Sequence, residues 1–346
     1  MPMAMTAGAA PTLETVAAYA GVSRATVSRV INHSPKVSPE VREAVEAAID
    51  ELGYVPNRAA RTLVTRRTDS LAMIIPEPDA FFFADPYLTT LVTEVNRALD
   101  DTELQLVLVM QGQGNHTPSH GRMERYVTSG HVDGVILVSV HEANPLPGIL
   151  AGAGVPVVHG GRPALSGTGR GGEKLPYVDV DNVFGARQAA EHLLGLGRQR
   201  IATIAGPADM SAGQDRLEGY TAALGDAGRD PLLERGDFTE ASGYAAARAL
   251  LAADPGLDAV FAASDLMARG ALRALREAGR RVPDDVAVVG FDDLGVAEAG
   301  DPPLTSVRQP IKLVARELVR LLLARLDGES VESMMLPTTL TRRASA

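Results

Sequence analysis

The segment GVSRATVSRVIN, residues 21–32, carries side chains that are suited to reading DNA. Two guanidinium groups, two hydroxyls and one small apolar side chain would share the solvent face of a short helix: Arg24, Ala25, Thr26, Ser28 and Arg29. An arginine can donate two hydrogen bonds to O6 and N7 of guanine, while hydroxyls bind phosphate oxygens. The same residues would also suit an ordinary solvated helical hairpin, so the interpretation depends on the elements around them.

Three short helices are expected to position this face. Gly21 permits the positive φ of a sharp turn, and Ser23 is expected to cap the second helix through its side-chain oxygen. Ser38 is expected to cap a third helix that begins at Pro39 and stops at Gly53. Apolar residues recur at helical spacing and predict one small core: Val16, Ala17, Ala20, Val22, Val27, Val30, Ile31, Val41, Val45, Ala48, Ile49 and Leu52.

A basic stretch, PNRAARTLVTRR, follows from Pro56 to Arg67. It can form a helix of about eight residues, with Ala59, Ala60 and Leu63 on one side. Because helix nucleation is costly, so short a helix needs a partner to be stable in water. Taken alone, the stretch would also suit a basic linker.

Together, GVSRATVSRVIN and VSPEVREAVEAAIDELGYVPNRAARTL resemble the head of the lactose-repressor and purine-repressor family of bacterial transcription regulators. The resemblance implies a hinge helix that pairs with its copy in a homodimer on operator DNA, with Leu63 wedged into the minor groove. The implied DNA contacts are Ser23, Arg24, Ala25, Thr26, Ser28, Arg29, Asn32, Asn57, Arg58, Ala60 and Leu63. Within the head, Thr26, Ser28 and Asn32 are expected to bind phosphate, and Arg24, Ala25 and Arg29 to select bases. Glu14 departs from the family pattern and should weaken phosphate binding.

Composition and charge agree with a small DNA-binding head on a larger acidic body. From Thr12 to Thr68, eight Lys and Arg face six Asp and Glu, a net of +2, whereas the other residues carry 25 against 37, a net of −12. Binding to nucleic acid is therefore expected only at the head. The chain has no cysteine, no basic apolar leader and no run of about 18 apolar residues. We expect a cytoplasmic protein, associated with the nucleoid when it binds its operator, and no membrane partner.

From Ser70 onward, apolar runs of strand length alternate with amphipathic helices, which predicts an α/β fold with two doubly wound parallel sheets. Their ligand should lie at the carboxyl ends of the strands, between two lobes. The expected domains are a helix-turn-helix head at 12–55, a hinge at 56–68 and a two-lobed domain at 69–346. Lobe 1 is expected at about 69–160 plus 307–327, and lobe 2 at about 177–305 plus 331–343. This region also resembles the family's effector domain, which is similar to periplasmic binding proteins, through HVDGVILVS, DRLEGY, SDLMARGAL, VAVVGFDD and PPLTSVRQP.

The resemblance implies a small-molecule effector, expected to be a sugar or related metabolite, and these contact residues: Phe82, Phe83, Arg216, Phe238, Ser264 and Asp292. Asp265 is expected to cap its helix. The aromatic cluster from Phe81 to Tyr87 is expected in a loop that lines the cleft, with core packing as the alternative. Family members often have a polar residue after the fourth strand, where this chain has Gly160 with Arg162 nearby, so one hydroxyl acceptor is missing.

Enzyme functions find little support. His116 and His120 lack a third metal ligand, and P-loop, nucleophile-elbow and HExxH motifs are absent from the sequence. We expect no catalytic residue, no metal and no cofactor. The sequence therefore predicts an effector-controlled, DNA-binding regulator, expected to be a repressor. The alternative is a sugar-binding protein or sugar-processing enzyme of similar fold that does not bind an operator.

Overall fold

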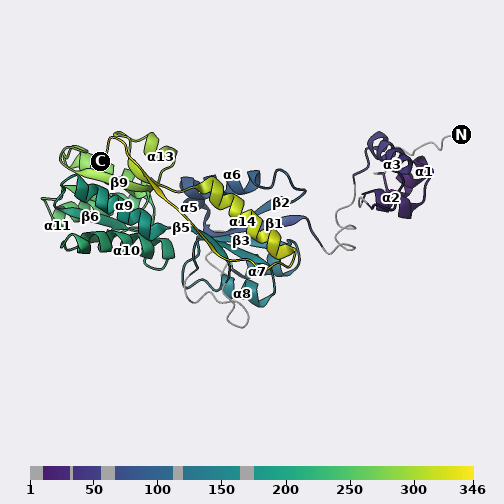
Figure 1. Cartoon of the computed structure of the whole chain (residues 1–346), viewed down its shortest axis with the longest axis horizontal. Helices are drawn as coiled ribbons and strands as arrows, with labels where there is room; N and C mark the ends of the chain where they lie inside the picture. Colours follow the sequence, from purple (N-terminus) through teal and green to yellow (C-terminus); the bar gives the residue numbers. More distant parts are fainter. Residues whose placement is uncertain (1–10, 32–33, 56–66, 112–119, 164–174) are drawn as a thin grey trace. The chain divides into compact units, whose positions relative to one another are not determined.

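The computed structural model describes residues 11–31, 34–55, 67–111, 120–163 and 175–346, and it divides into two compact units. The first unit ends at Thr68 and the second begins at Asp69. Figure 1 shows the elements of each unit.

The described residues of the first unit form three helices: α1 (Leu13–Tyr19), α2 (Arg24–Ile31) and α3 (Pro39–Leu52). Gly21 has a φ of +67°, as the turn between α1 and α2 requires. The Thr26 N–H donates to Ser23 Oγ at 3.1 Å, which confirms Ser23 as the cap of α2. Ser38 holds the N-cap position of α3, but its side chain makes no capping hydrogen bond. Gly53 ends α3, as predicted, and its backbone lies in the left-handed region.

One apolar core holds these three helices together. Its buried members come from all three helices and from the turn that follows α3: Val16, Ala17, Val27, Val30, Val45, Ala48 and Tyr54. The predicted inward faces of the helices are therefore confirmed, and α2 keeps its polar side toward solvent.

The second unit is built from two sheets of six strands, and each sheet with its helices forms one lobe (Figure 1). The sheet of lobe 1 has the order β11-β5-β4-β3-β1-β2. Its strands, in chain order, are β1 (Ser70–Pro78), β2 (Gln105–Gln111), β3 (Gly134–Val138), β4 (Val157–Gly160), β5 (Tyr177–Val180) and β11 (Met334–Leu336). One face packs on α6 (Pro86–Arg97) and α14 (Ile311–Leu326), and the other on α7 (His120–Thr128) and α8 (Leu146–Gly152).

The sheet of lobe 2 has the order β12-β10-β9-β8-β6-β7, and only β12 runs antiparallel to its neighbour. Its strands are β6 (Ile201–Ala205), β7 (Leu232–Arg235), β8 (Ala259–Ala262), β9 (Ala287–Asp292), β10 (Thr305–Arg308) and β12 (Thr339–Thr341). One face packs on α11 (Glu240–Ala253) and α12 (Asp265–Glu277), and the other on α9 (Asn182–Gly195) and α10 (Ser211–Asp226). The short helix α13 (Gly295–Glu298) follows β9.

The lobe boundaries expected from the sequence need correction. β5, expected in lobe 2, pairs in parallel with β4 of lobe 1. The segment 331–343, expected as one strand of lobe 2, instead supplies β11 to lobe 1 and β12 to lobe 2. β10, which the expected bounds divide between the two lobes, is a strand of lobe 2. The cause is physical: a short apolar strand suits either sheet equally well, and its pairing partners decide which sheet it joins. The chain therefore crosses between the lobes three times, after β5, β10 and β11.

Candidate functional site

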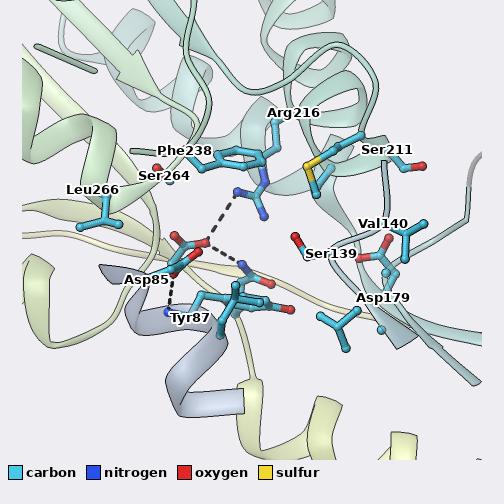
Figure 2. A pocket seen from close by; sticks show the side chains of 18 of the residues that line it. Asp85, Tyr87, Ser139, Val140, Asp179, Ser211, Arg216, Phe238, Ser264 and Leu266 are labelled. Atoms are coloured by element: carbon cyan, nitrogen blue, oxygen red, sulfur yellow. Dashed lines mark hydrogen bonds and ion pairs between the residues drawn. The ribbon is translucent and has the colours of Figure 1, made fainter. Parts of the chain in front are cut away.

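A cleft between the two lobes collects the carboxyl ends of strands from both sheets. It encloses about 1010 Å³, its open mouth included. Figure 2 shows Asp85, Tyr87, Ser139 and Asp179 of lobe 1 opposite Arg216 and other residues of lobe 2. Because the strands of a doubly wound sheet present their carboxyl ends along one edge, the fold itself brings these polar groups together.

Arg216, on α10, is buried in this cleft with 6% of its surface exposed. Its Nε donates to Asn182 Oδ1 at 2.8 Å, and its Nη1 donates to the Ala263 carbonyl at 2.6 Å. The guanidinium lies over the Phe291 ring, 3.7 Å from the ring centroid. The hydrogen bonds found among the described residues use Nε and Nη1, so Nη2 is left for a ligand. Arg216 therefore lines the cleft, and its contact with an effector stays a prediction.

Asp292, at the end of β9, also lines the cleft as expected. Its Oδ1 accepts a hydrogen bond from Gln309 Nε2 at 2.7 Å and lies 3.6 Å from Arg216 Nη1. Burial raises the pKa of the Asp292 carboxyl to about 7, although the Arg216 charge opposes this shift. Near neutral pH the group can therefore either donate or accept a hydrogen bond to a hydroxyl.

Backbone strain gathers at the same place. Ser139, Phe238 and Asp292 have φ values of +57°, +66° and +118°, and all three line the cleft. Such conformations cost a non-glycine residue on the order of 1–3 kcal/mol and cluster at functional sites. The strain supports the assignment of the cleft as the functional site of this unit.

The helix cap expected at Asp265 is provided by its neighbour Ser264, which was expected to contact the effector. Ser264 is the N-cap of α12, because its Oγ accepts from the Met267 N–H, whereas Asp265 was expected to cap this helix. The Asp265 carboxylate instead accepts from Ser306 Oγ at 2.6 Å and from the Leu294 N–H at 3.2 Å. It therefore joins α12 to the residues that follow β9 and begin β10. Both residues line the cleft, but the Ser264 hydroxyl already serves the helix.

The aromatic side chains of the cleft are only partly those expected. Phe238 lines it, with its ring beside the Arg216 guanidinium (Figure 2). Phe82 and Phe83 do not line it: Phe82 is 4% exposed in the lobe 1 core, and Phe83 is 70% exposed. The cause is that 79–84 form a short helix, α5, rather than the expected loop, and a helix turns successive side chains in different directions. Phe81 and Tyr87 are the cluster members that line the cleft.

Two acidic residues of the cleft were not foreseen. Asp85 caps α6, accepting from the Tyr87 N–H at 2.7 Å, and burial raises the pKa of its carboxyl to about 6. Asp179, at the end of β5, accepts from the Arg162 N–H at 2.7 Å, and burial raises the pKa of its carboxyl too. The Asp-Pro pair at the start of α6 was the sequence signal that could have identified Asp85.

His159, in β4, was also missed. It is 1% exposed and lines the cleft, and its Nε2 has no hydrogen-bond partner among the described residues. Burial lowers the pKa of the imidazole to about 4, so the ring is neutral at physiological pH. Gly160 and Arg162, noted in the sequence as a departure, line the cleft beside it. The Arg162 guanidinium reaches Asp215 of lobe 2, with Nη2 and Oδ1 2.5 Å apart.

The other candidate surface is α2 of the first unit. Ser23, Arg24, Ala25 and Arg29 are exposed, while Thr26 and Ser28 are half-buried. Asn32, Asn57, Arg58, Ala60 and Leu63 lie outside the described residues, so their predicted DNA contacts remain predictions.

Glu14, on α1, lies beside this surface. Its carboxylate is 3.1 Å from Arg24 Nη1, and both side chains are exposed. Hydrogen bonds from the Glu14 backbone and the Thr12 side chain, with the Arg24 charge, lower the pKa of the Glu14 carboxyl. The predicted contact of Arg24 with a base would therefore have to compete with this ion pair.

The residues that the structure describes include no group of His, Cys, Asp and Glu that could hold a metal ion. None of their helices combines the length and the apolar content needed to cross a membrane.

A three-helix DNA-reading head joined to a two-lobed cleft defines the class of ligand-responsive transcription regulators. Comparison with known proteins identifies the family. The model described as "Bacterial regulatory proteins, lacI family" matches residues 12–57, and that of a periplasmic binding protein-like domain matches residues 190–346. The HTH-type transcriptional regulator CelR of Thermobifida fusca is 54% identical over 329 residues, covering 94% of this chain and 95% of that protein. The chain belongs to the lacI family of bacterial transcription regulators, and it is a DNA-binding regulator rather than an enzyme.

Other relatives and solved structures agree. The repressor CytR of Escherichia coli K12 is 33% identical over 335 residues, covering 94% of this chain and 92% of that protein. A solved complex of the regulator CelR with cellobiose is 51% identical with a TM-score of 0.75, and covers 97% of this chain and 100% of that chain. A lac repressor dimer bound to operator and the anti-inducer ONPF is 30% identical with a TM-score of 0.83. The match covers 97% of this chain and 98% of that chain.

Proposed function

We propose that this chain is a cytoplasmic repressor that binds a near-palindromic operator as a homodimer and releases it when cellobiose or a similar glucose disaccharide binds between the lobes. The observation that carries the proposal is the cleft, in which buried polar groups of both lobes converge beside aromatic rings. The solved CelR complex with cellobiose supports the choice of sugar, and the lac repressor dimer on operator supports the dimer.

The chemistry of the cleft suits a neutral sugar. Asp85, Asp179 and Asp292 can accept hydrogen bonds from hydroxyls, and Arg216 Nη2 can donate to one. The rings of Phe238 and Tyr87 offer apolar faces for the C–H side of a sugar ring. An anionic ligand fits less well, because a carboxylate would meet three acidic groups around the buried Arg216 guanidinium.

The coupling to DNA follows from a shift between populations. A sugar that contacts both lobes favours the arrangement in which those contacts form together. In this proposal that arrangement disfavours pairing of the two hinge segments, residues 56–68, on the operator. Release then needs only a difference in sugar affinity between the two arrangements, and 1–3 kcal/mol corresponds to roughly a 5–150-fold change in operator affinity.

The test combines two titrations of the full chain. Cellobiose is titrated by calorimetry into wild type and Asp292→Asn, with Asp230→Asn as the control because Asp230 is an exposed aspartate of lobe 2. Fluorescence anisotropy then follows release of an operator that wild type has selected from random DNA. We expect binding and release for wild type and the control, and roughly tenfold weaker binding for Asp292→Asn. Absence of heat and of release at millimolar cellobiose would show that the effector is a different molecule.

The alternative without operator binding is set aside by family membership, because the head that matches the family at residues 12–57 is its DNA-binding part.

A further inference from the structure

Two charged contacts join lobe 1 to lobe 2. His141, which follows β3 of lobe 1, places its Nδ1 2.8 Å from Oδ2 of Asp209, which follows β6 of lobe 2. The Glu142 N–H also donates to the Asp209 carbonyl at 2.9 Å. Arg162, which follows β4 of lobe 1, pairs with Asp215 on α10 of lobe 2 at 2.5 Å. None of these residues forms part of the crossing segments, so covalent connection does not force the contacts.

We propose that these two pairs, His141 with Asp209 and Arg162 with Asp215, form an ionic latch that holds the lobes together and sets how readily the cleft closes on its ligand. The acidic members both come from the start of α10 or the loop before it, and the cationic members both come from loops of lobe 1. Opening the cleft therefore separates both pairs at once.

The surroundings of Arg162 and Asp215 favour a charged pair. The Asp215 side chain is 9% exposed, so its attraction to Arg162 is screened less by water than at an open surface. Burial raises the pKa of the Asp215 carboxyl, and the adjacent Arg162 charge opposes this shift and favours the ionised form. A variant that removes only one member would leave the other charge without its partner.

Glu77 makes His141 a cation. Its buried Oε1 accepts from Ser139 Oγ at 2.7 Å and lies 3.2 Å from His141 Nε2. The hydrogen bond between His141 and Glu77 raises the pKa of His141 to about 9, against the effect of burial. The hydrogen bond between His141 and Asp209 acts in the same direction to a smaller degree. Glu77 and Asp209 are the charged groups of the described residues within ion-pair distance of the ring. At neutral pH, the latch therefore has its positive charge.

The contact between His141 and Asp209 should weaken as the pH rises. Because the folded protein holds the His141 proton more tightly than a free histidine does, the contact is complete well below pH 9 and is lost as the pH rises through about 9. Glu77 belongs to the same lobe as His141 and stays with it on opening. Replacing it with glutamine should therefore move the loss of the contact toward neutral pH.

The absence of cysteine from the chain allows a direct measurement of the lobe separation. Spin labels are attached at Ala153→Cys in lobe 1 and Ala222→Cys in lobe 2, both of which are exposed positions, and their distance distribution is measured by pulsed electron resonance without sugar. The test variant is Asp209→Asn with Asp215→Asn. The matched control is Asp226→Asn, which removes an ion pair with Arg187 that lies wholly within lobe 2, at 2.6 Å.

We expect the double variant to shift population to longer distances, and the control to match wild type. For wild type, the population at short distance should fall between pH 7.5 and 9.5, earlier in Glu77→Gln, and not at all in His141→Gln. A double variant that matches the control would overturn the latch, and a pH response that persists in His141→Gln would overturn the role of the histidine.

The regulatory meaning of the latch rests on the proposed function, so cellobiose affinity is measured in the same variants. We expect roughly tenfold weaker binding in the double variant and no change in the control. If wild type binds no cellobiose, the proposed effector is wrong, and the distance measurement still decides whether the latch exists. If wild type binds and the double variant binds equally well, the latch does not control the cleft.

Discussion

Burial gives the Asp292 carboxyl a proton affinity that an exposed aspartate lacks. Its pKa of about 7 means that the folded protein retains this proton at pH values where the unfolded chain has lost it. The group therefore adds stability below about pH 4, and this contribution disappears as the pH rises to about 7. A ligand hydroxyl that donates to the ionised carboxylate would offset part of the loss.

The first prediction concerns this proton. In Asp292→Asn, the free energy of unfolding should fall less between pH 4 and pH 7 than it does in wild type, because the amide does not titrate. Urea unfolding at steps of half a pH unit measures the difference, with Asp230→Asn as the exposed control. Parallel curves for wild type and Asp292→Asn would show that the carboxyl is not held neutral.

The second prediction separates two charges of the DNA-reading face. Arg29→Ala should weaken operator binding about tenfold or more, since a bidentate arginine contact to guanine contributes about 1–3 kcal/mol of discrimination. Glu14→Gln should instead tighten binding slightly, because it frees Arg24 from an exposed ion pair that water screens strongly. Anisotropy titrations from 50 to 200 mM salt measure both. Unchanged binding in Arg29→Ala would exclude a base-reading role for this arginine.

At the scale of elements, glycines set how closely the helices of lobe 2 approach. A Cβ at Gly270 of α12 would lie 2.1 Å from the Glu240 carbonyl oxygen of α11, and one at Gly243 of α11 would lie 2.2 Å from the Met267 carbonyl oxygen of α12. The two backbones therefore touch where each helix has no side chain.

The third prediction uses this contact. Gly270→Ala should lower the free energy of unfolding by about 1–3 kcal/mol, because the added methyl must push the helices apart. The matched control is Gly225→Ala in α10, where an added Cβ meets nothing within 4 Å. Alanine should stabilise that helix by up to about 1 kcal/mol. Equal effects in urea unfolding would mean that the α11–α12 contact is loose.

Elements with strong local signals could be predicted from the sequence. The Gly21 turn, the Ser23 cap and the apolar faces of the head follow from residue type and spacing, and the structure confirms them. The lobe assignments of β5 and β11 could not be predicted, because they depend on pairing between residues far apart in the chain.

Some residues of the cleft could likewise be predicted from the sequence, and others could not. Arg216, Phe238 and Asp292 could be placed through family motifs, whereas the choice among Phe81, Phe82 and Phe83 depends on the rotation of α5. His159 and His141 gave no motif at all. Their environments come from loops and strands that meet only in the folded lobes.

At the scale of the whole molecule, the two units should respond differently to ligand. A ligand present at 100 times its dissociation constant stabilises the unit that binds it by about 2.7 kcal/mol. The fourth prediction is therefore that cellobiose raises the unfolding temperature of the unit from Asp69 to Ala346 and leaves that of the head unchanged. Differential scanning calorimetry, with near-ultraviolet dichroism to assign each transition, measures this. An equal shift of both transitions would contradict a binding site confined to the cleft.

The three passages of the chain between the lobes also determine the order in which the protein can fold as it is made. The lobe 1 sheet begins with β1 at Ser70 but is complete only with β11 at Met334–Leu336, and the lobe 2 sheet needs β12 at Thr339–Thr341. Contacts so distant in sequence form slowly, because a long loop must close before they stabilise anything. We therefore expect the two sheets to be completed at nearly the same point of synthesis, because their last strands are close in sequence. The head, whose contacts are local, can fold long before a cleft exists to control it.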